Sequence, residues 1–183
     1  MPELPKVIVL TGRAGSGKST IAAELVASHG YTVVKFAGPL KSMLRALGLT
    51  DAEIEGDLKE KPCALLGWCT PRHAMQTLGT EWGRNLIDTD LWVAAWQHAV
   101  RGVLASGGRV VVDDCRFRNE LSAAMEMGGV AVRLVRDGAG TTAHVSETGL
   151  DAVELPVIIN AAAPAAVAGE VLRMAESILE TLA

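Results

Sequence analysis

The chain lacks the features that mark secreted, membrane-spanning and nucleic-acid-coating proteins. It has only three cysteines, an odd number without the paired spacing of a zinc site, which favours free thiols in a reducing compartment. It has no basic surplus, since its formal net charge is −4, and this argues against a general nucleic-acid binder. No apolar run is long enough to cross a bilayer, and the N-terminal MPELPKVIVL does not follow the signal-peptide pattern. We therefore expect a cytosolic protein.

The remaining composition is typical of an ordinary globular protein. With 183 residues, of which 49% are hydrophobic and 21% charged, the chain can bury a core without disulfides or metals to staple it. The sequence shows no internal repeat and no linker long enough to divide it. We therefore predict a single domain over residues 1–183.

Apolar runs and helical patterns alternate along the chain. Strands are expected at residues 7–10, 31–36, 109–114, 129–135 and 156–160, and helices at 19–29, 119–127 and 163–182. Residues 39–106 give mostly helical signals, whereas residues 137–150 are rich in glycine and threonine. Strands alternating with helices predict an α/β fold of three layers, a central parallel sheet with helices on both faces.

Residues 12–19, GRAGSGKS, match the phosphate-binding P-loop pattern without a mismatch. An apolar strand leads into the segment and an amphipathic helix leads out, which argues against a glycine-rich turn that matches by chance. The glycines let the backbone turn its N–H groups inward around a polyphosphate, and the helix N-terminus adds partial positive charge. Lys18 would then reach the β- and γ-phosphates, and the Ser19 hydroxyl would ligate Mg²⁺.

The run VVVDD, residues 110–114, supports a nucleotide site. P-loop proteins place an acidic residue at the tip of a neighbouring strand, where it orients Mg²⁺ or a water bound to it. Asp113 and Asp114 should point to opposite faces of an extended strand, so we expect only one of them to serve. The other would be a helix cap or the solvated start of a loop.

The stretch TPRHAMQTLGTEWGR, residues 70–84, predicts a helix that holds an anion. Thr70 can cap its first turn, and Pro71 suits the first helical position. Winding at about 3.6 residues per turn separates a polar stripe from an apolar one. The polar stripe contains Arg72, Gln76, Gly79 and Thr80, and the apolar stripe contains Met75, Leu78 and Trp82. Because the helix dipole disfavours a cation in the first turn, Arg72 suggests a bound anion there.

The pattern as a whole favours a small P-loop kinase. No Asn-Lys-x-Asp motif follows the P-loop, so a GTPase switch protein is not expected. Small P-loop kinases insert a helical acceptor-binding region after the second strand and a short lid late in the fold. Residues 39–106 and 137–150 occupy these two places.

From about residue 6 to residue 160 the chain resembles the phage-type deoxynucleoside monophosphate kinases. The shared segments, in order, are GRAGSGKST (12–20), FAGPLK (36–41), PRHAMQTLGTEWGR (71–84), DLW (90–92), DDCRFRNE (113–120) and HVSE (144–147). The resemblance implies a Mg²⁺-dependent homodimer that moves the γ-phosphate of ATP to a deoxynucleoside monophosphate. It implies no membrane and no polymeric nucleic acid as partners, and a cytoplasmic location, in the host if the gene is a phage gene.

The resemblance also points to individual site residues. The expected ATP and phosphate contacts are Gly12, Arg13, Ala14, Gly15, Ser16, Gly17, Lys18, Ser19, Thr20 and Arg136. The expected acceptor contacts are Arg72, Gln76, Gly79, Thr80, Trp92, Arg116 and Glu120. The expected catalytic residues are Lys18, Arg72, Asp114, Arg116 and Glu120, with Ser19 and Asp114 toward Mg²⁺.

Each of these groups has an expected task. Arg72 would hold the 5′-phosphate of the acceptor, and Gln76 one turn on would read the sugar or base. Gly79 would leave room for a ring, while Thr80 would add a hydroxyl. Arg116 would neutralise charge between the two phosphates. Glu120 would orient an arginine or the sugar.

Several alternatives stay open at this stage. Trp92 could stack on a base or belong to the core, where Trp82 and Trp96 are expected. Arg136 could clamp ATP or be solvated. A P-loop kinase for another small metabolite, such as a coenzyme precursor, is the rival enzyme. A nucleotide-binding regulatory module without phosphotransfer is the rival of another class. Arg72 and Arg116 argue against that module.

Overall fold

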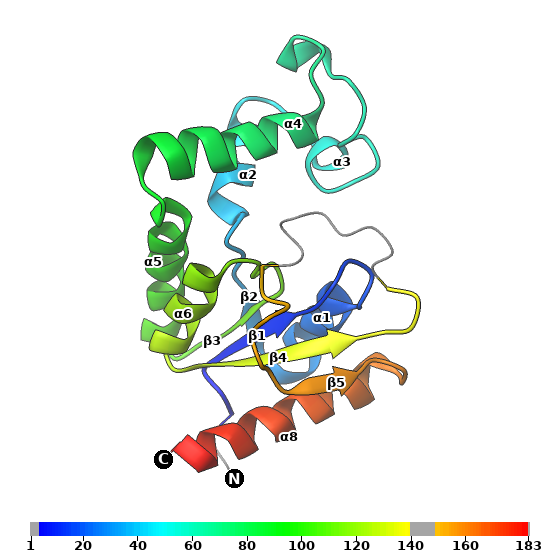
Figure 1. Ribbon diagram of the computed structural model, residues 1–183, viewed down its shortest axis with the longest axis vertical. Coiled ribbons are helices and arrows are strands. Elements are labelled where there is room, and N and C mark those ends of the chain that lie inside the picture. Colours follow the sequence, from blue (N-terminus) through cyan, green and yellow to red (C-terminus); the bar gives the residue numbers. More distant parts are fainter. Residues whose placement is uncertain (1–3, 140–148, 183) are drawn as a thin grey trace. The chain divides into compact units, whose positions relative to one another are not determined.

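The computed structural model describes residues 4–139 and 149–182, which divide into two compact units (Figure 1). The first unit is formed by the chain before Phe36 and after Trp96, and the second unit by Phe36–Trp96. The second unit covers most of the region expected to bind the acceptor, residues 39–106. That role, and the assignment of the whole chain to one domain, stay predictions.

The first unit contains a five-stranded parallel sheet. Its strands are β1 (Val7–Thr11), β2 (Tyr31–Val33), β3 (Arg109–Val112), β4 (Gly129–Val135) and β5 (Val157–Ile159). Their order across the sheet is β2-β3-β1-β4-β5, so the strand that leads into residues 12–19 lies in the centre. The five expected strands are confirmed. However, β2 and β3 end at Val33 and Val112, earlier than their apolar patterns suggested.

Helices cover both faces of this sheet, as expected. Helices α1 (Lys18–His29) and α8 (Pro164–Leu182) pack together on one face, where Ile8 and Leu10 of β1 join their core. Val7 points to the other face, because side chains alternate along a strand, and there α6 (Arg118–Glu126) packs against β1 and β4. Residues Gln97 onward of α5 (Leu91–Ala105) also belong to this unit. Within the described part of the chain, no helix is long and apolar enough to span a bilayer.

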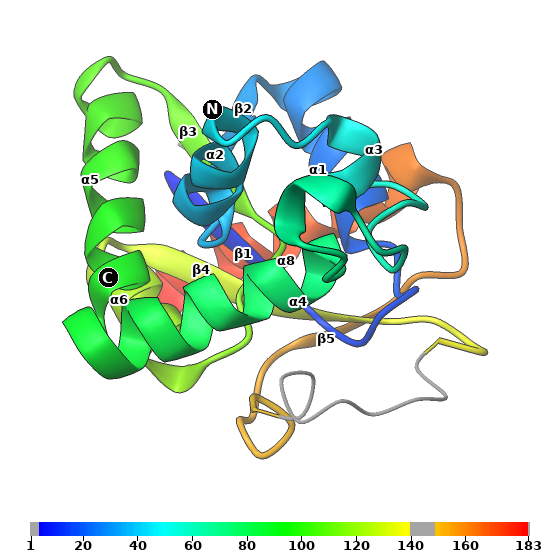
Figure 2. The ribbon, with the colours of Figure 1, turned by 90° about the horizontal axis from the view of Figure 1, so that it is seen from above.

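The second unit is helical. Its elements are α2 (Gly38–Ala46), α3 (Asp51–Ile54), the short 3₁₀ helix η1 (Ala64–Leu66), α4 (Pro71–Gln76), η2 (Thr77–Ile87) and the first residues of α5. Its buried core consists of Leu40, Leu44, Leu49, Ile54 and Trp92. Trp96 is fully buried and stacks on Phe36 with 4.5 Å between ring centroids, so its expected place in the core is confirmed. Figure 2 shows these helices from above.

The helix that begins after Thr70 departs from the expected winding. Its start is as predicted, because the Thr70 hydroxyl accepts a hydrogen bond from the backbone N–H of His73 at 3.1 Å and Pro71 takes the first position. From Thr77 onward, however, the chain continues as a π-helix, in which each N–H bonds five residues back. A stripe drawn at 3.6 residues per turn therefore does not extend to Gly79 and Thr80.

Trp92 stabilises this wider winding. Its indole Nε1–H donates a hydrogen bond to the Gly79 carbonyl at 2.7 Å. Its ring also lies so close to Gly83 that a Cβ added there would stand 2.6 Å from the ring atoms. A Cβ at Gly79, in contrast, would make an ordinary 3.6 Å contact with Leu40. The glycine that the packing requires is therefore Gly83. Trp82 tilts against Trp92 and is 37% exposed, so its expected burial is wrong.

Candidate functional site

A cavity of about 470 Å³ lies within the first unit, at the carboxyl ends of β1, β3 and β4. Parallel α/β sheets bind their ligands at this edge. Residues from five segments line the cavity: 11–14, 16 and 18; 113–116; 133–136; 139; and 150–151. The P-loop, the residues after β3 and the start of the candidate lid thus meet at one place.

The backbone of the P-loop has positive φ at Gly12, Gly15 and Gly17, and neighbouring atoms also exclude a side chain at Gly12 and Gly17. Gly12 has φ 130°, and a Cβ there would lie 2.3 Å from the Leu134 carbonyl oxygen. Gly17 has φ 90° and immediately precedes helix α1, whose first residue is Lys18. The first N–H groups of a helix have no partner within it, so the turn at Gly17 delivers donors and partial positive charge to the loop.

Lys18 closes the loop on itself. Its ammonium donates hydrogen bonds to the carbonyl oxygens of Gly12 at 2.6 Å and Arg13 at 2.9 Å, and the side chain lines the cavity. Ser19 and Thr20 follow in the first turn of α1, are exposed, and are not among the residues that line the cavity. The lysine therefore lies where the loop can present it to a phosphate.

Asn160, which the sequence analysis treated only as the end of a strand, braces this loop. Its side-chain amide donates a hydrogen bond to the Ser16 carbonyl at 2.8 Å, and its backbone N–H donates to the Val135 carbonyl at 2.7 Å. The amide nitrogen also occupies the place of a Gly17 Cβ, which would lie only 2.2 Å away. Gly17 is therefore required both by its φ and by Asn160.

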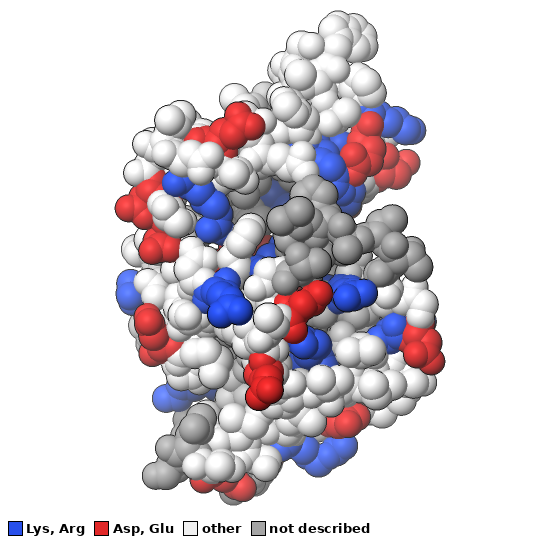
Figure 3. Space-filling model, in the orientation of Figure 1, with Lys and Arg blue, Asp and Glu red and all other residues white. Residues whose placement is uncertain are grey.

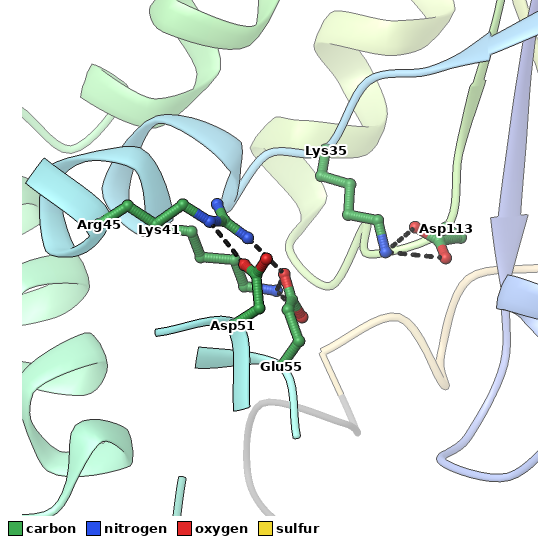
Figure 4. Close-up of polar contacts among 6 residues, drawn as sticks. All are labelled: Lys35, Lys41, Arg45, Asp51, Glu55 and Asp113. Carbon is green, nitrogen blue, oxygen red and sulfur yellow. Dashed lines mark hydrogen bonds and ion pairs between the residues drawn. The ribbon is translucent and has the colours of Figure 1, made fainter. Parts of the chain in front are cut away.

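Both aspartates after β3 line the cavity, whereas the alternation of an extended strand would turn their side chains to opposite faces. The strand ends at Val112 and the chain bends at Asp113, so the alternation of an extended strand no longer applies. Asp113 is 4% exposed and forms an ion pair with Lys35, whose ammonium lies 3.1 and 3.2 Å from its two carboxylate oxygens (Figure 4). Asp114 is only partly buried.

Glu120 organises the turn that carries Arg116. It is 3% exposed, and its Oε2 accepts hydrogen bonds from the backbone N–H groups of Arg116 at 2.8 Å and Phe117 at 3.1 Å. These bonds satisfy donors at the beginning of α6. Glu120 thus fixes the backbone from which the exposed Arg116 side chain extends.

The buried Cys115 thiol between these acidic groups stays protonated. Burial raises its pKa well above the ordinary range, and the carboxylates of Glu120 and Asp114 raise it further. Because the thiolate is the reactive species, we expect iodoacetamide to modify Cys115 at least about a hundredfold more slowly than the exposed Cys69. Peptide mapping by mass spectrometry would follow both sites, with the urea-unfolded protein as a control in which both react. Equal native rates would contradict the buried position.

The cavity has a positive balance of charge. Its lining includes five cationic side chains, Arg13, Lys18, Arg116, Arg133 and Arg136, and three aspartates, Asp113, Asp114 and Asp151. Asp113 is already paired with Lys35 from outside the lining, whereas Arg13 pairs with Asp151 at 3.4 Å. On the face seen in Figure 3, by contrast, side chains of both signs are intermixed. The arrangement therefore suits a small polyanion inside the cavity.

The second unit holds the other predicted acceptor contacts. Arg72 is partly exposed, and its Nε donates to the Glu60 carboxylate. Gln76 and Thr80 are exposed, whereas Trp92 is 5% exposed within the core. Nearby ion pairs join Lys41 to Glu55 and Arg45 to Asp51 and Glu55 (Figure 4). Arg116 and Glu120 belong to the first unit, so the predicted acceptor residues come from both units.

The candidate lid, residues 137–150, is only partly described. Residues 140–148, with His144, Ser146 and Glu147 of the HVSE segment, lie outside the described residues. At its start, Arg136 is exposed and lines the cavity. Besides Asn160, the sequence analysis missed Lys35 and Arg133. Neither stands in a recognisable motif, so only the folded chain reveals their partners.

Two solved structures with a similar fold are described as kinases. A sugar kinase from Janibacter sp. HTCC2649 superposes with a TM-score of 0.50 and 13% identity over 96% of this chain and 94% of that one. A gluconokinase from Sinorhizobium meliloti 1021 gives a TM-score of 0.48 and 20% identity over 98% and 97% of the two chains. The superposition on the sugar kinase, together with the parallel sheet and the P-loop geometry, gives the fold of the α/β P-loop kinases.

Sequence comparison gives the family. The family model described as deoxynucleotide monophosphate kinase matches residues 65–163. A viral protein of Acanthamoeba polyphaga mimivirus, described as "Putative deoxynucleotide monophosphate kinase", is 31% identical over 161 residues, which cover 81% of this chain and 83% of that protein. The chain therefore belongs to the deoxynucleotide monophosphate kinase family, as its motifs predicted, and it is a kinase.

Proposed function

We propose that this kinase transfers the γ-phosphate of ATP to a deoxynucleoside 5′-monophosphate and releases ADP and the deoxynucleoside diphosphate. The cavity in the first unit carries the proposal, because it combines a P-loop, a lysine at the helix N-terminus and a surplus of arginines. Membership of the deoxynucleotide monophosphate kinase family supports the choice of acceptor.

In this mechanism the P-loop binds the phosphates of ATP. The N–H groups at the start of α1 donate to phosphate oxygens, and Gly12 and Gly17 allow the backbone to come close. The Lys18 ammonium, which bonds loop carbonyls in this structure, would turn one or more of its three donors toward the β- and γ-phosphates. Arg136 would approach the nucleotide from the end of β4.

The residues beside the P-loop fit a magnesium ion. Mg²⁺ prefers oxygen ligands and usually takes one or two carboxylates together with phosphates and waters. Asp114, which carries a carboxylate, lines the cavity, and Ser19, which carries a hydroxyl, follows the P-loop lysine. Among the described residues no group of three or more His, Cys, Asp or Glu is arranged to hold a metal ion. When bound, Mg²⁺ would neutralise charge on the donor phosphates.

The two aspartates are expected to differ in function. Asp114→Asn should lower kcat about tenfold or more and shift the Mg²⁺ concentration needed for half-maximal rate. Asp113→Asn should instead lower the free energy of unfolding by about 1–3 kcal/mol, because it breaks a buried charged hydrogen bond to Lys35. Mg²⁺ titrations of the rate and urea unfolding of both variants test this. The reverse pattern would assign the metal to Asp113.

The acceptor phosphate needs no general base, because its attacking oxygen is already ionised. The enzyme has to align that oxygen with the γ-phosphate and stabilise the charge that gathers between them. We assign the grip on the acceptor phosphate to Arg72, and contacts with the sugar or base to Gln76, Gly79, Thr80 and Trp92. Arg116, presented by the Glu120-capped turn, would stabilise charge between the two phosphates.

An ADP-release assay over all common deoxy- and ribonucleoside monophosphates tests the proposal. We expect ADP release that depends on a deoxynucleoside monophosphate and yields the diphosphate. Turnover with only a different small acceptor would indicate another P-loop kinase activity. Slow ATP hydrolysis that no acceptor accelerates would contradict phosphotransfer altogether.

A further inference from the structure

We propose that Arg133 is a further binding residue for the donor polyphosphate, an inference that rests on the proposed use of ATP. Arg133 is a partly buried arginine on β4 that lines the same cavity as Lys18. Three observations carry the proposal: its position in the sheet, the way its guanidinium is held, and the lack of an acidic partner among the described residues.

The position places Arg133 beside the beginning of the P-loop. In the parallel pairing of β1 with β4, Arg133 is the register partner of Thr11, and Gly12 follows directly. The Thr11 hydroxyl donates a hydrogen bond to the Val132 carbonyl at 3.3 Å, which ties the two strands at this level. Arg133 thus extends from β4 near the carboxyl ends of the strands, where the cavity lies.

Two backbone carbonyls fix the guanidinium. Its Nη2 donates to the carbonyl oxygens of Leu150 at 2.6 Å and Val153 at 2.9 Å, which uses both hydrogens of that nitrogen. The hydrogens on Nε and Nη1 have no hydrogen-bond partner among the described residues. An arginine held in this way can offer a planar pair of donors without losing further rotamer freedom.

The charge of Arg133 has no counterion within the described residues. Other charged residues of the cavity lining do have a partner of opposite charge, since Arg13 pairs with Asp151 and Asp113 pairs with Lys35. A partly buried cation has given up part of its hydration, and carbonyl oxygens compensate only some of that loss. A phosphate group would supply both the missing charge and acceptors for the remaining donors.

Arg109 provides a matched control. It is also a partly buried arginine on a strand, and its Nη2 donates to a backbone carbonyl, that of His29 at 3.1 Å. Its guanidinium lies 5.6 Å from the centre of the Tyr31 ring. Arg109 begins β3, at the amino ends of the strands, whereas the cavity lies at their carboxyl ends. Arg109 does not line the cavity. We therefore expect Arg109 to contribute to folding and not to ligand binding.

The experiment measures binding by calorimetry, with two probes, inorganic tripolyphosphate and the non-hydrolysable ATP analogue AMP-PNP. Arg133→Gln should weaken both by roughly ten- to a hundredfold, because a charged hydrogen bond to phosphate is lost while an amide remains to bond the carbonyls. Arg133→Lys should retain part of the affinity. Arg109→Gln should bind both probes like the wild type, even if its melting temperature falls.

The outcomes separate this inference from the proposed function. If the wild type binds both probes and Lys18→Ala weakens them, but Arg133→Gln binds normally, Arg133 is no phosphate ligand and the donor site stands. If the wild type binds neither probe, both proposals fail. Should Arg133→Gln lower melting temperature as Arg109→Gln does and leave the salt dependence of tripolyphosphate binding unchanged, its role is structural and the inference is overturned.

Discussion

Lys18→Ala is expected to lower kcat/KM for phosphotransfer by about a hundredfold or more while the protein stays folded. In this structure the ammonium bonds the backbone of the loop through the carbonyls of Gly12 and Arg13. Its removal therefore costs little packing, but takes away the charge nearest the transferred phosphate. Steady-state kinetics with ATP and the best acceptor, together with circular dichroism and a melting curve, measure the two effects separately.

The control for this substitution is Lys61→Ala, which removes the same charge from an exposed position. Its rate should stay close to that of the wild type, which shows that net charge alone does not account for the loss. Near-normal turnover in a folded Lys18→Ala protein would contradict the assignment of the P-loop as the donor site.

Arg72→Ala is expected to raise the KM for the acceptor by roughly ten- to a hundredfold and to change the KM for ATP much less. Arg72 stands in the first turn of α4, where Glu60 is its one acidic partner among the residues that the structure describes. An acceptor phosphate would replace that exposed carboxylate. Arg72→Lys should recover part of the loss, because an ammonium cannot make the bidentate contact of a guanidinium.

Measuring the change in KM for acceptors with different bases distinguishes a residue that binds the phosphate from one that contacts the base. The Arg72 defect should be nearly uniform over all acceptors, because all share the phosphate, whereas Gln76→Ala should act unevenly if its amide reads the base edge. Arg45→Ala is the matched control, since Arg45 is 42% exposed and paired with Asp51, much as Arg72 is 43% exposed and paired with Glu60. An Arg72→Ala enzyme that loses ATP affinity and keeps acceptor affinity would refute the assignment.

Local sequence patterns predict much of the first unit. Apolar runs gave the strands, and the P-loop spacing together with its flanking strand and helix gave the cavity's central feature. Both are local signals, complete within about twenty residues. The end of β3 was misplaced, because its apolar pattern does not reveal that Asp113 leaves the strand to meet Lys35.

The features that sequence patterns missed depend on tertiary contacts. Asn160 bonds a loop 144 positions earlier, and the π-helix winding is tied to the indole of Trp92, 13 positions beyond Gly79. Neither contact leaves a periodic signature in the chain. The stripe from Arg72 to Thr80 was therefore predicted with α-helical spacing that holds only as far as Gln76.

The contact between Asn160 and Ser16 sets an order of events during synthesis. The P-loop leaves the ribosome before β4, which pairs with β1, and before Asn160, which holds the loop, because both come more than a hundred residues later. A nascent chain that ends before Asn160 carries the whole phosphate-binding motif but lacks the brace at Gly17. The phosphate-binding motif is therefore synthesised well before the residue that holds it, and a growing chain acquires this contact only when the sheet is nearly finished.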